Sequence, residues 1–558
     1  MIKHKNSSNY EIFKNLRTKL RQFNHSREVS YILIFAFFYK YCSDSLKDYL
    51  LSVIEDKEIT FDETFMDPYY TEVFRNDAFK MFGYYINKPE AYIDEVINTQ
   101  YNESFFISSF FKAFSENIEF ETDSNYEKYF KFVFDAFEKE VHVDKMEYDR
   151  EYYLIYKDLI YLISKLEIYE DEFSFVEIFN RLCQSRHIYV DCDSDYINYI
   201  LVELVYASKS SPMEVYNPFL KDGSSLISLA DKFPFNFGNS YGMEHDTITY
   251  CVCIIKLFMN YFDLDNVFLE FGNAVESVDI DGPYYDVVMS KIPQIGVWKS
   301  KIASKTQTKD FAKMNNRRKL EDVLYENFNV SFDEEQCYDA LDVLLDNIKI
   351  MPQKSSFGGE YESLKDSEYL FLINLINCLK KDGIMVVAIP QSFLFKNSLY
   401  LLRKYLIFEC NYIDTIISIP NYLGRTNAPE IICIFKKDKM NDNILFVDSS
   451  QSFKTKKTSS TFHGMFKRNL IPSDETIEKL IDVYLNKKII DKYSNVVNIS
   501  DIADNEFNLS VSRYVDTFEG EFIDLKDLAH EKEEITSNIK KLNKKIDEMM
   551  DELDLRFY

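Results

Sequence analysis

The stretch that decides the fold reads Val215-Tyr-Asn217-Pro218-Phe-Leu-Lys221-Asp-Gly223-Ser-Ser-Leu226. It begins as a strand, passes through a polar turn with one glycine, and continues as a helix. Such a turn can present backbone N–H groups and a helix N-terminus to a bound ligand. Only 13 of the 558 residues are glycine, so a glycine in this turn is informative.

Strands and helices alternate on both sides of this turn. The candidate strands are 214–219, 241–244, 267–271, 284–289, 384–389, 412–419 and 430–435, with helical segments at 247–262, 367–380 and 399–408. Alternation of this kind predicts the α/β class with a mainly parallel, doubly wound (Rossmann-like) sheet. Ligands of such a sheet bind at the carboxyl ends of its strands.

The two ends of the chain are helical in pattern. From about 9 to 179 apolar residues recur three and four apart, which predicts an N-terminal helical domain. Near the other end a seam spaced 4, 3, 4, 3 and 4 is typical of a coiled coil or docking helix, formed by Ile535, Ile539, Leu542, Ile546, Met549 and Leu553. A lone helix with this seam exposes apolar surface, so we expect a partner.

The charge is strongly negative and unevenly placed. Asp and Glu number 92 against 65 Lys and Arg, a net charge of −27, so any nucleic-acid contact needs a local basic patch. The candidate is a DNA-binding island at 299–319 with eight cations and one acid, 8 − 1 = +7: Lys299, Lys301, Lys305, Lys309, Lys313, Arg317, Arg318 and Lys319 against Asp310. Phosphate contacts from it would position DNA without specifying sequence. A solvated insertion that balances nearby acids explains the same run.

Cysteine, histidine and hydropathy patterns exclude several classes. Nine cysteines without a CxxC pair argue against a disulfide framework or zinc ribbon, and the seven histidines lack metal-ligand spacing, so we predict no metal site. The N-terminus has no signal-like apolar run, and the most apolar stretch, 31–39, is about half of a membrane span. We therefore expect a cytoplasmic protein that has no membrane contact.

Polar residues end four successive candidate strands. The first ends at Asn217-Pro218, the second at Glu244, the third at Phe271-Gly-Asn273, and the fourth at Lys291-Ile292-Pro293-Gln294. Each alone is an ordinary strand-end turn. Four in this order indicate a cofactor site, where a carboxylate such as Glu244 could accept both hydroxyls of a ribose.

With these residues in place, the chain resembles the modification (methyltransferase) subunit of type I restriction-modification systems, an adenine-N6 DNA methylase family, over nearly its whole length. Asn217-Pro218 and Gly223 stand where the family has Asp-Pro-x-Cys-Gly-Ser-Gly, the loop that holds S-adenosylmethionine. Glu244 falls on the ribose-binding acid, and Asn273 on the next strand end. The resemblance implies two kinds of partner. One is DNA, and the other is a specificity subunit or another defence protein that binds through the C-terminal helix.

The departures from the family bear on catalysis. Lys291, Ile292, Pro293 and Gln294 align with its catalytic Asn-Pro-Pro-Phe. The reaction needs acceptors for the hydrogens of the amine, and lysine offers only donors. Gln294 removes an aromatic contact worth about 1–3 kcal/mol per base. In the loop, Asn217, Lys221 and Asp222 replace an acid, a glycine and a serine of the family.

We therefore interpret the chain as a modification-subunit-like protein of a restriction or phage-defence system, with its methyltransferase chemistry impaired and cofactor binding doubtful. The alternatives are an active adenine-N6 methyltransferase with drifted motifs, and a protein that binds S-adenosylmethionine without transfer. The predicted domains are a helical domain at 1–185, a methyltransferase-like domain at 186–445 with a basic insertion at about 299–360, a connecting segment at 446–520, and a C-terminal coiled-coil or docking helix at 521–558.

Overall fold

The computed structural model describes most of the chain. The described residues are 8–21, 27–54, 59–100, 107–141, 150–169, 173–185, 188, 190–192, 195–211, 214–234, 238–272, 274, 285–292, 371–420, 430–450, 473–516 and 525–552. They form two compact units, 1–515 and 516–558. The whole basic island at 299–319 and the positions Asn273, Pro293 and Gln294 lie outside the described residues.

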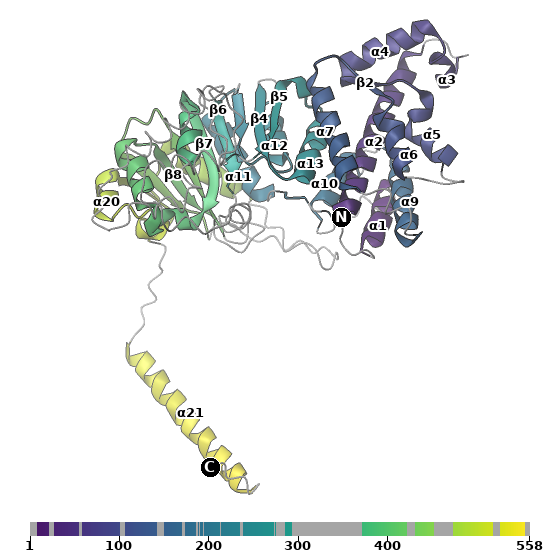
Figure 1. Cartoon of the computed structure of the whole chain (residues 1–558). Helices are drawn as coiled ribbons and strands as arrows, with labels where there is room; N and C mark the ends of the chain where they lie inside the picture. The colour runs from purple at the N-terminus through teal and green to yellow at the C-terminus, as the bar shows by residue number, and fades with distance from the viewer. Residues whose placement is uncertain are drawn as a thin grey trace, which may run out of the picture. The chain divides into compact units, whose positions relative to one another are not determined.

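The N-terminal part is a helical bundle with one small two-stranded antiparallel sheet (Figure 1). Its elements are α1 (Ser8–Leu20), α2 (Arg27–Val53), α3 (Phe61–Thr64), α4 (Pro68–Phe82), β1 (Tyr84–Ile86), α5 (Ile93–Gln100), α6 (Ile107–Ser115), β2 (Ile118–Phe120), α7 (Asn125–Glu140), α9 (Arg150–Ser164) and α10 (Phe175–Cys183). Helix α11 (Asp195–Ser208) packs on the sheet that follows. Helix α2 is the centre of the bundle, because every residue from Val29 to Ser43 is buried. A helix that is apolar all round is stable only when other helices surround it.

A nine-stranded sheet follows, in the order β11-β10-β8-β9-β7-β6-β3-β4-β5. The strands are β3 (Glu214–Asn217), β4 (Asn239–Glu244), β5 (Val267–Phe271), β6 (Tyr285–Lys291), β7 (Leu379–Pro390), β8 (Ile413–Ser418), β9 (Glu430–Lys436), β10 (Asn443–Asp448) and β11 (Ser494–Asn498). The helices of this part are α12 (Ser224–Lys232), α13 (Thr247–Met259), α17 (Phe371–Asn377), α18 (Tyr400–Lys404), α19 (Asp474–Asn486) and α20 (Ile499–Asp504).

The α/β class is confirmed, and the sheet is mixed. Strands β5, β4, β3, β6 and β7 run parallel, as do β8 and β10. Strand β9 is antiparallel to both of its neighbours, and β11 is antiparallel to β10. The antiparallel β9 brings its first residue, Glu430, to the edge where the parallel strands β6 and β7 end.

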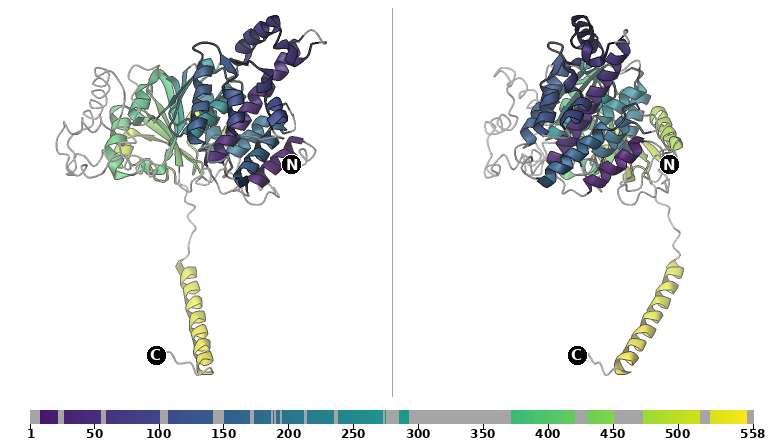
Figure 2. Two further views of the ribbon diagram at one scale, coloured as in Figure 1. Left: turned by 45° about the vertical axis from the view of Figure 1, so that its right-hand side comes forward. Right: turned by 90° about the vertical axis from the view of Figure 1, so that its right-hand side faces the viewer.

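Helix α13 joins the sheet to the helical bundle. It contacts β4 and α12 on one side and α2, α7 and α10 on the other (Figures 1 and 2). Every residue from Ile248 to Met259 is buried. The sequence pattern of this segment indicated an amphipathic helix, but α13 has no solvent-exposed face. The N-terminal helices cover the side that an α/β unit alone would expose.

Helix α7 covers the open edge of the sheet. The Tyr129 hydroxyl donates to the carbonyl of Val267 at 2.6 Å and accepts from the N–H of Leu269 at 2.8 Å. The Asn125 amide and the Lys128 ammonium donate to other carbonyls near or on β5. These side chains bind backbone groups at the outer edge of β5 that an added strand would need. Another polypeptide therefore cannot pair with those groups by strand addition.

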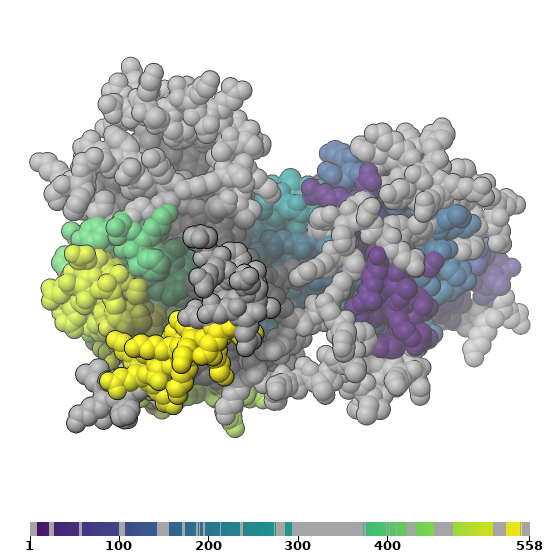
Figure 3. Space-filling model, turned by 90° about the horizontal axis from the view of Figure 1, so that it is seen from below, coloured from purple at the N-terminus to yellow at the C-terminus, as the bar shows by residue number. Residues whose placement is uncertain are grey.

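The predicted connecting segment at 446–520 contributes to the sheet-bearing unit. It carries the end of β10, helix α19, strand β11 and helix α20, and the unit extends to Val515. Seen from below, α1 and the elements from α17 to α20 lie on opposite sides of the first unit (Figure 3). The domain boundaries themselves stay predictions.

The second unit contains helix α21 (Leu525–Glu552). The seam residues Ile535, Ile539, Leu542, Ile546 and Met549 are 52–60% exposed. The helix is therefore present, and its pairing in a coiled coil stays a prediction. Within the described residues, no helix is long and apolar enough to cross a membrane.

Candidate functional site

The turn between β3 and α12 is held by the Asn217 side chain, which is fully buried. Its oxygen accepts the N–H of Phe219 at 3.1 Å and the hydroxyl of Ser290 at 2.7 Å. Its amide nitrogen donates to the Ser225 hydroxyl at 2.7 Å. Both acceptor sites of the amide oxygen are thus used inside the protein. Asn217 ties β3, α12 and β6 together, and its oxygen has no capacity left for a ligand.

The backbone of the turn keeps a glycine-like form at two positions. Gly223 has φ 75°, and Lys221, where the family has a glycine, has φ 53°. A non-glycine residue in this left-handed region is strained by roughly 1–2 kcal/mol. The Lys221 ammonium lies 3.5 Å from the Asp191 carboxylate and the residue is 8% exposed. The turn therefore combines a left-handed backbone at residue 221 with a buried lysine side chain.

A buried ion pair lies behind the turn. The Lys256 ammonium of α13 is 2.8 Å from the Asp222 carboxylate and 2.5 Å from the Ser224 hydroxyl. The two charged residues are 3% and 1% exposed. Asp222 also accepts the Ser224 hydroxyl at 2.9 Å. The carboxylate therefore occupies the N-terminus of α12, where a helix would otherwise attract an anionic ligand.

The protonation of this pair follows from its contacts. Burial raises the pKa of Asp222, but the Lys256 ammonium and the Ser224 hydroxyl outweigh burial, so the pKa lies below its ordinary value. Burial lowers the pKa of Lys256, but the attraction of the Asp222 carboxylate outweighs burial. The pKa of Lys256 therefore lies above its ordinary value. Both groups are charged at neutral pH.

Glu244, at the end of β4, is 5% exposed and is held by the turn. Its Oε2 accepts the N–H of Lys221 at 3.0 Å. Its Oε1 accepts the backbone N–H groups of His245 at 2.9 Å and Asp246 at 2.8 Å. A ribose hydroxyl would therefore have to compete with three backbone donors for this carboxylate.

At the carboxyl end of β6, Lys291 makes an ion pair that the sequence did not indicate. Its ammonium is 3.1 Å from Oε1 of Glu430, the first residue of β9. The residues are 7% and 5% exposed. Strand β7 lies between them, and the small residue Ala388 is the register partner of Lys291. The pair therefore crosses β7, and the other Glu430 oxygen, Oε2, has no hydrogen-bond partner among the described residues.

Six of the predicted cofactor and catalytic positions lie in the described residues, at this edge or beside it. Asn217, Pro218, Gly223 and Glu244 belong to one turn and the strand beside it, and Lys291 ends the next strand in the sheet. Ile292 is buried and its N–H donates to the Ala388 carbonyl. Asn273, Pro293, Gln294 and the island lie outside the described residues. No cluster of described residues could hold a metal ion.

Three partner residues were missed in the sequence: Asp191, Lys256 and Glu430. Lys256 left a signal, since it is the one charged residue in the apolar run from Thr247 to Met259. Glu430 and Asp191 left none, because surface acids are common and their partners are 139 and 30 residues away in the chain.

The side chains at the turn do not fit S-adenosylmethionine as the resemblance places it. The Asn217 oxygen is fully used, Glu244 accepts three backbone N–H groups, and the Lys221 side chain is buried. The Asp222 carboxylate accepts the N–H of Ser224, the first residue of α12, at 3.4 Å. These side chains already have partners inside the protein.

Comparisons with known proteins agree with the resemblance. Residues 348–521 match the family model described as N-6 DNA Methylase, a range that does not include the turn or Lys291. The type I restriction enzyme MpnII methylase subunit of Mycoplasma pneumoniae is 22% identical over 380 residues, 65% of this chain and 59% of the relative. The MjaVII methylase subunit of Methanocaldococcus jannaschii is 25% identical over 379 residues, 66% and 55% of the two chains.

This chain thus spans little more than half the length of those curated relatives. Among solved structures, the type I restriction-modification methyltransferase subunit from Streptococcus thermophilus has a TM-score of 0.66 and 18% identity, and covers 91% of this chain and 99% of its own. A chain from a structure of type I system assembly has a TM-score of 0.51 and 12% identity, over 98% and 99% of the two chains. At these identities the likeness concerns the fold.

Replacing Lys256 with methionine should strongly destabilise the protein, because it leaves the Asp222 carboxylate buried and unpaired. The expected loss in free energy of unfolding at pH 7 is about 3–5 kcal/mol, measured by urea denaturation. Lys232→Met, which breaks the more exposed pair with Glu203, is the control and should cost about 0–1 kcal/mol.

The pH dependence gives a second readout. In the wild type, the lowered pKa of Asp222 contributes stability above its ordinary pKa of about 4, which is lost as pH falls through the lower folded value. In Lys256→Met, burial should raise the pKa of Asp222, so the deficit relative to wild type should shrink as pH falls from 7 towards about 4. A deficit that is constant over this range would contradict the assignment of the pair.

Proposed function

We propose that this chain, which resembles the modification subunits of type I restriction-modification systems, is a DNA-associated, modification-subunit-like component of such a system or of a related phage-defence system, and that it does not methylate adenine. The single observation that carries the second half is the buried pair of Lys291 and Glu430 at the family's catalytic asparagine position.

Two properties of the pair oppose transfer to an exocyclic amine. The ammonium of Lys291 is a donor, whereas the amine hydrogens need acceptors. The pair is also 7% and 5% exposed and is tied across β7, so neither side chain reorients without leaving a buried charge unpaired. The turn that misfits the cofactor, at the end of the neighbouring strand β3, supports the same conclusion.

An active adenine-N6 methyltransferase is the second candidate. It is favoured by the retained glycine-like backbone at Lys221 and Gly223 and by the position of Glu244 beside the turn. A protein that binds S-adenosylmethionine without transfer is a variant of this candidate. Both require cofactor binding, which the proposed function does not.

Purified protein should show no binding of S-adenosylmethionine by calorimetry, and no transfer of labelled methyl groups to DNA, alone or with a specificity subunit. A ligand at a hundred times its Kd would stabilise the protein by about 2.7 kcal/mol, which a thermal-unfolding assay detects readily. An established S-adenosylmethionine-dependent methyltransferase is the positive control. Transfer would overturn the proposed function, and binding without transfer would replace it with the ligand-binding variant.

DNA contact is proposed for the basic island at 299–319, whose net charge is +7 in a chain of −27. Reversing Arg317 and Arg318 to glutamate should weaken DNA binding and reduce the slope of log K against log salt by about 2, if each neutralises one phosphate. Lys479→Glu, on an exposed position of α19, is the control and should leave the slope unchanged. An unchanged slope in the double variant would exclude the island.

Partner contact is proposed for the exposed seam of α21, which an isolated helix in water would leave unpaired. Leu542→Asp should abolish co-elution with a specificity-type subunit in size-exclusion chromatography. Lys544→Asp, off the seam of the same helix, is the matched control and should retain it. Co-elution that survives Leu542→Asp would place the contact elsewhere.

A further inference from the structure

One face of the sheet carries a row of aromatic rings that ends at its edge strand, β5. Tyr216 pairs with Tyr241, and Tyr241 pairs with Phe268, in the parallel register of β3, β4 and β5. The rings of Tyr241 and Phe268 are stacked, with centroids 5.0 Å apart and planes 17° apart. On the other face of the same strands, Val215 and Val267 are buried at 0% and 1% exposure.

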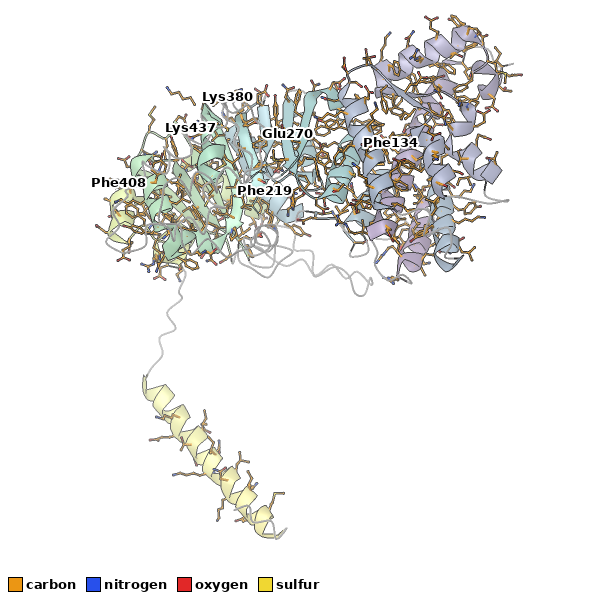
Figure 4. All side chains as sticks on the ribbon, in the orientation of Figure 1. Phe134, Phe219, Glu270, Lys380, Phe408 and Lys437 are labelled. Atoms are coloured by element: carbon orange, nitrogen blue, oxygen red, sulfur yellow. The ribbon has the colours of Figure 1, made fainter. Side chains whose placement is uncertain are left out.

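The outer end of this row is open. Phe268 is 41% exposed, and β5 is the last strand of the sheet, so no further strand continues the row. Tyr241 is its one ring contact among the described residues. Glu270 lies on the same face two residues on, about 6.6 Å along the strand, and is exposed (Figure 4). In the described part of the chain Glu270 forms no ion pair.

The edge cannot take a partner by strand addition. Helix α7 binds the backbone of Val267 and Leu269 through Tyr129, and Lys128 also donates to Leu269. The side chains of Val267 and Leu269 face the buried side, so α7 leaves the Phe268 and Glu270 side chains uncovered. A partner at this edge must therefore be recognised by side chains.

A ring face beside a carboxylate matches one side chain best. A guanidinium can stack on an aromatic ring and donate two parallel hydrogen bonds to a carboxylate. An ammonium is compact and strongly hydrated, and gains less from the ring. Nucleic acid could also stack here, but its phosphates would meet Glu270 and, further along the row, Glu214, in a chain of net charge −27.

We propose that Phe268 and Glu270 form a docking site for an arginine side chain of a partner polypeptide. The site lies at the edge of β5, away from the pair of Lys291 and Glu430, and does not depend on whether methyl transfer occurs.

The probe is a fluorescent peptide of alternating glycine and arginine, compared with its lysine and citrulline counterparts by anisotropy at 0.15 M salt. An acidic chain attracts any cationic peptide, so affinity for the arginine peptide does not by itself locate the binding site. Phe268→Thr and Glu270→Gln should each lower the affinity for the arginine peptide about two- to fivefold. Each should also reduce the ratio of the affinity for the arginine peptide to that for the lysine peptide. A photo-reactive version of the peptide should crosslink within residues 261–274, and Phe268→Thr should remove this crosslink.

Matched controls are Tyr69→Thr and Glu475→Gln, an exposed aromatic and an exposed acid away from the row, which should change neither readout. Thermal unfolding confirms that each variant is folded, and threonine keeps the strand preference of the site. Equal affinity of wild type and Phe268→Thr, or no preference for arginine over lysine, would overturn the proposal. The proposal would also be overturned if Phe268→Thr lowered the affinity for a single-stranded oligonucleotide and left the affinity for the arginine peptide unchanged.

Discussion

Helix α13 has no solvent face, and the rest of the structure depends on this constraint. It lies between the sheet and the N-terminal helices, so each polar group on it needs a partner inside the protein. Lys256 finds that partner in Asp222, in the turn after β3. This pair anchors the turn to α13. The turn then holds Glu244, because the N–H of Lys221 donates to its carboxylate. Bundle, sheet and turn therefore pack as one unit.

The same constraint applies to the other charged residues at the carboxyl edge of the sheet, each of which has a counter-charge. A buried charge is tolerated only with its counter-charge, and loss of one partner costs several kcal/mol. Asp222 is matched by Lys256, Lys291 by Glu430, and Lys221 by Asp191. Asp222, Lys291 and Lys221 stand at positions that the resemblance assigns to a cofactor or a base, and each makes contacts inside the protein. Removing one member of such a pair would leave the other without its counter-charge.

Much of the fold was predictable because period-2 and period-3.6 patterns are local. The seven predicted strands overlap β3 to β9, and the α/β class followed from their alternation with helices. Strands β10 and β11 were missed. Strand β11 reads Ser494-Asn-Val-Val-Asn498 and is half polar, since it lies at the edge of the sheet, and such a run resembles a loop. The buried character of α13 was also missed, because it is imposed by helices α2, α7 and α10, which lie far earlier in the chain.

Residue types and their spacing were sufficient to place the strand ends, the glycine turn, the basic island and the heptad seam, because each depends on neighbours a few residues away. The partners of Lys221, Asp222 and Lys291 required the folded chain. Strand β9 is antiparallel and enters the sheet beside β7, which brings Glu430 within 3.1 Å of a lysine 139 residues earlier. No local pattern encodes that approach, since it follows from the order of strands in the sheet. Pairing of buried charges is thus a property of topology, which the spacing of residues along the chain does not reveal.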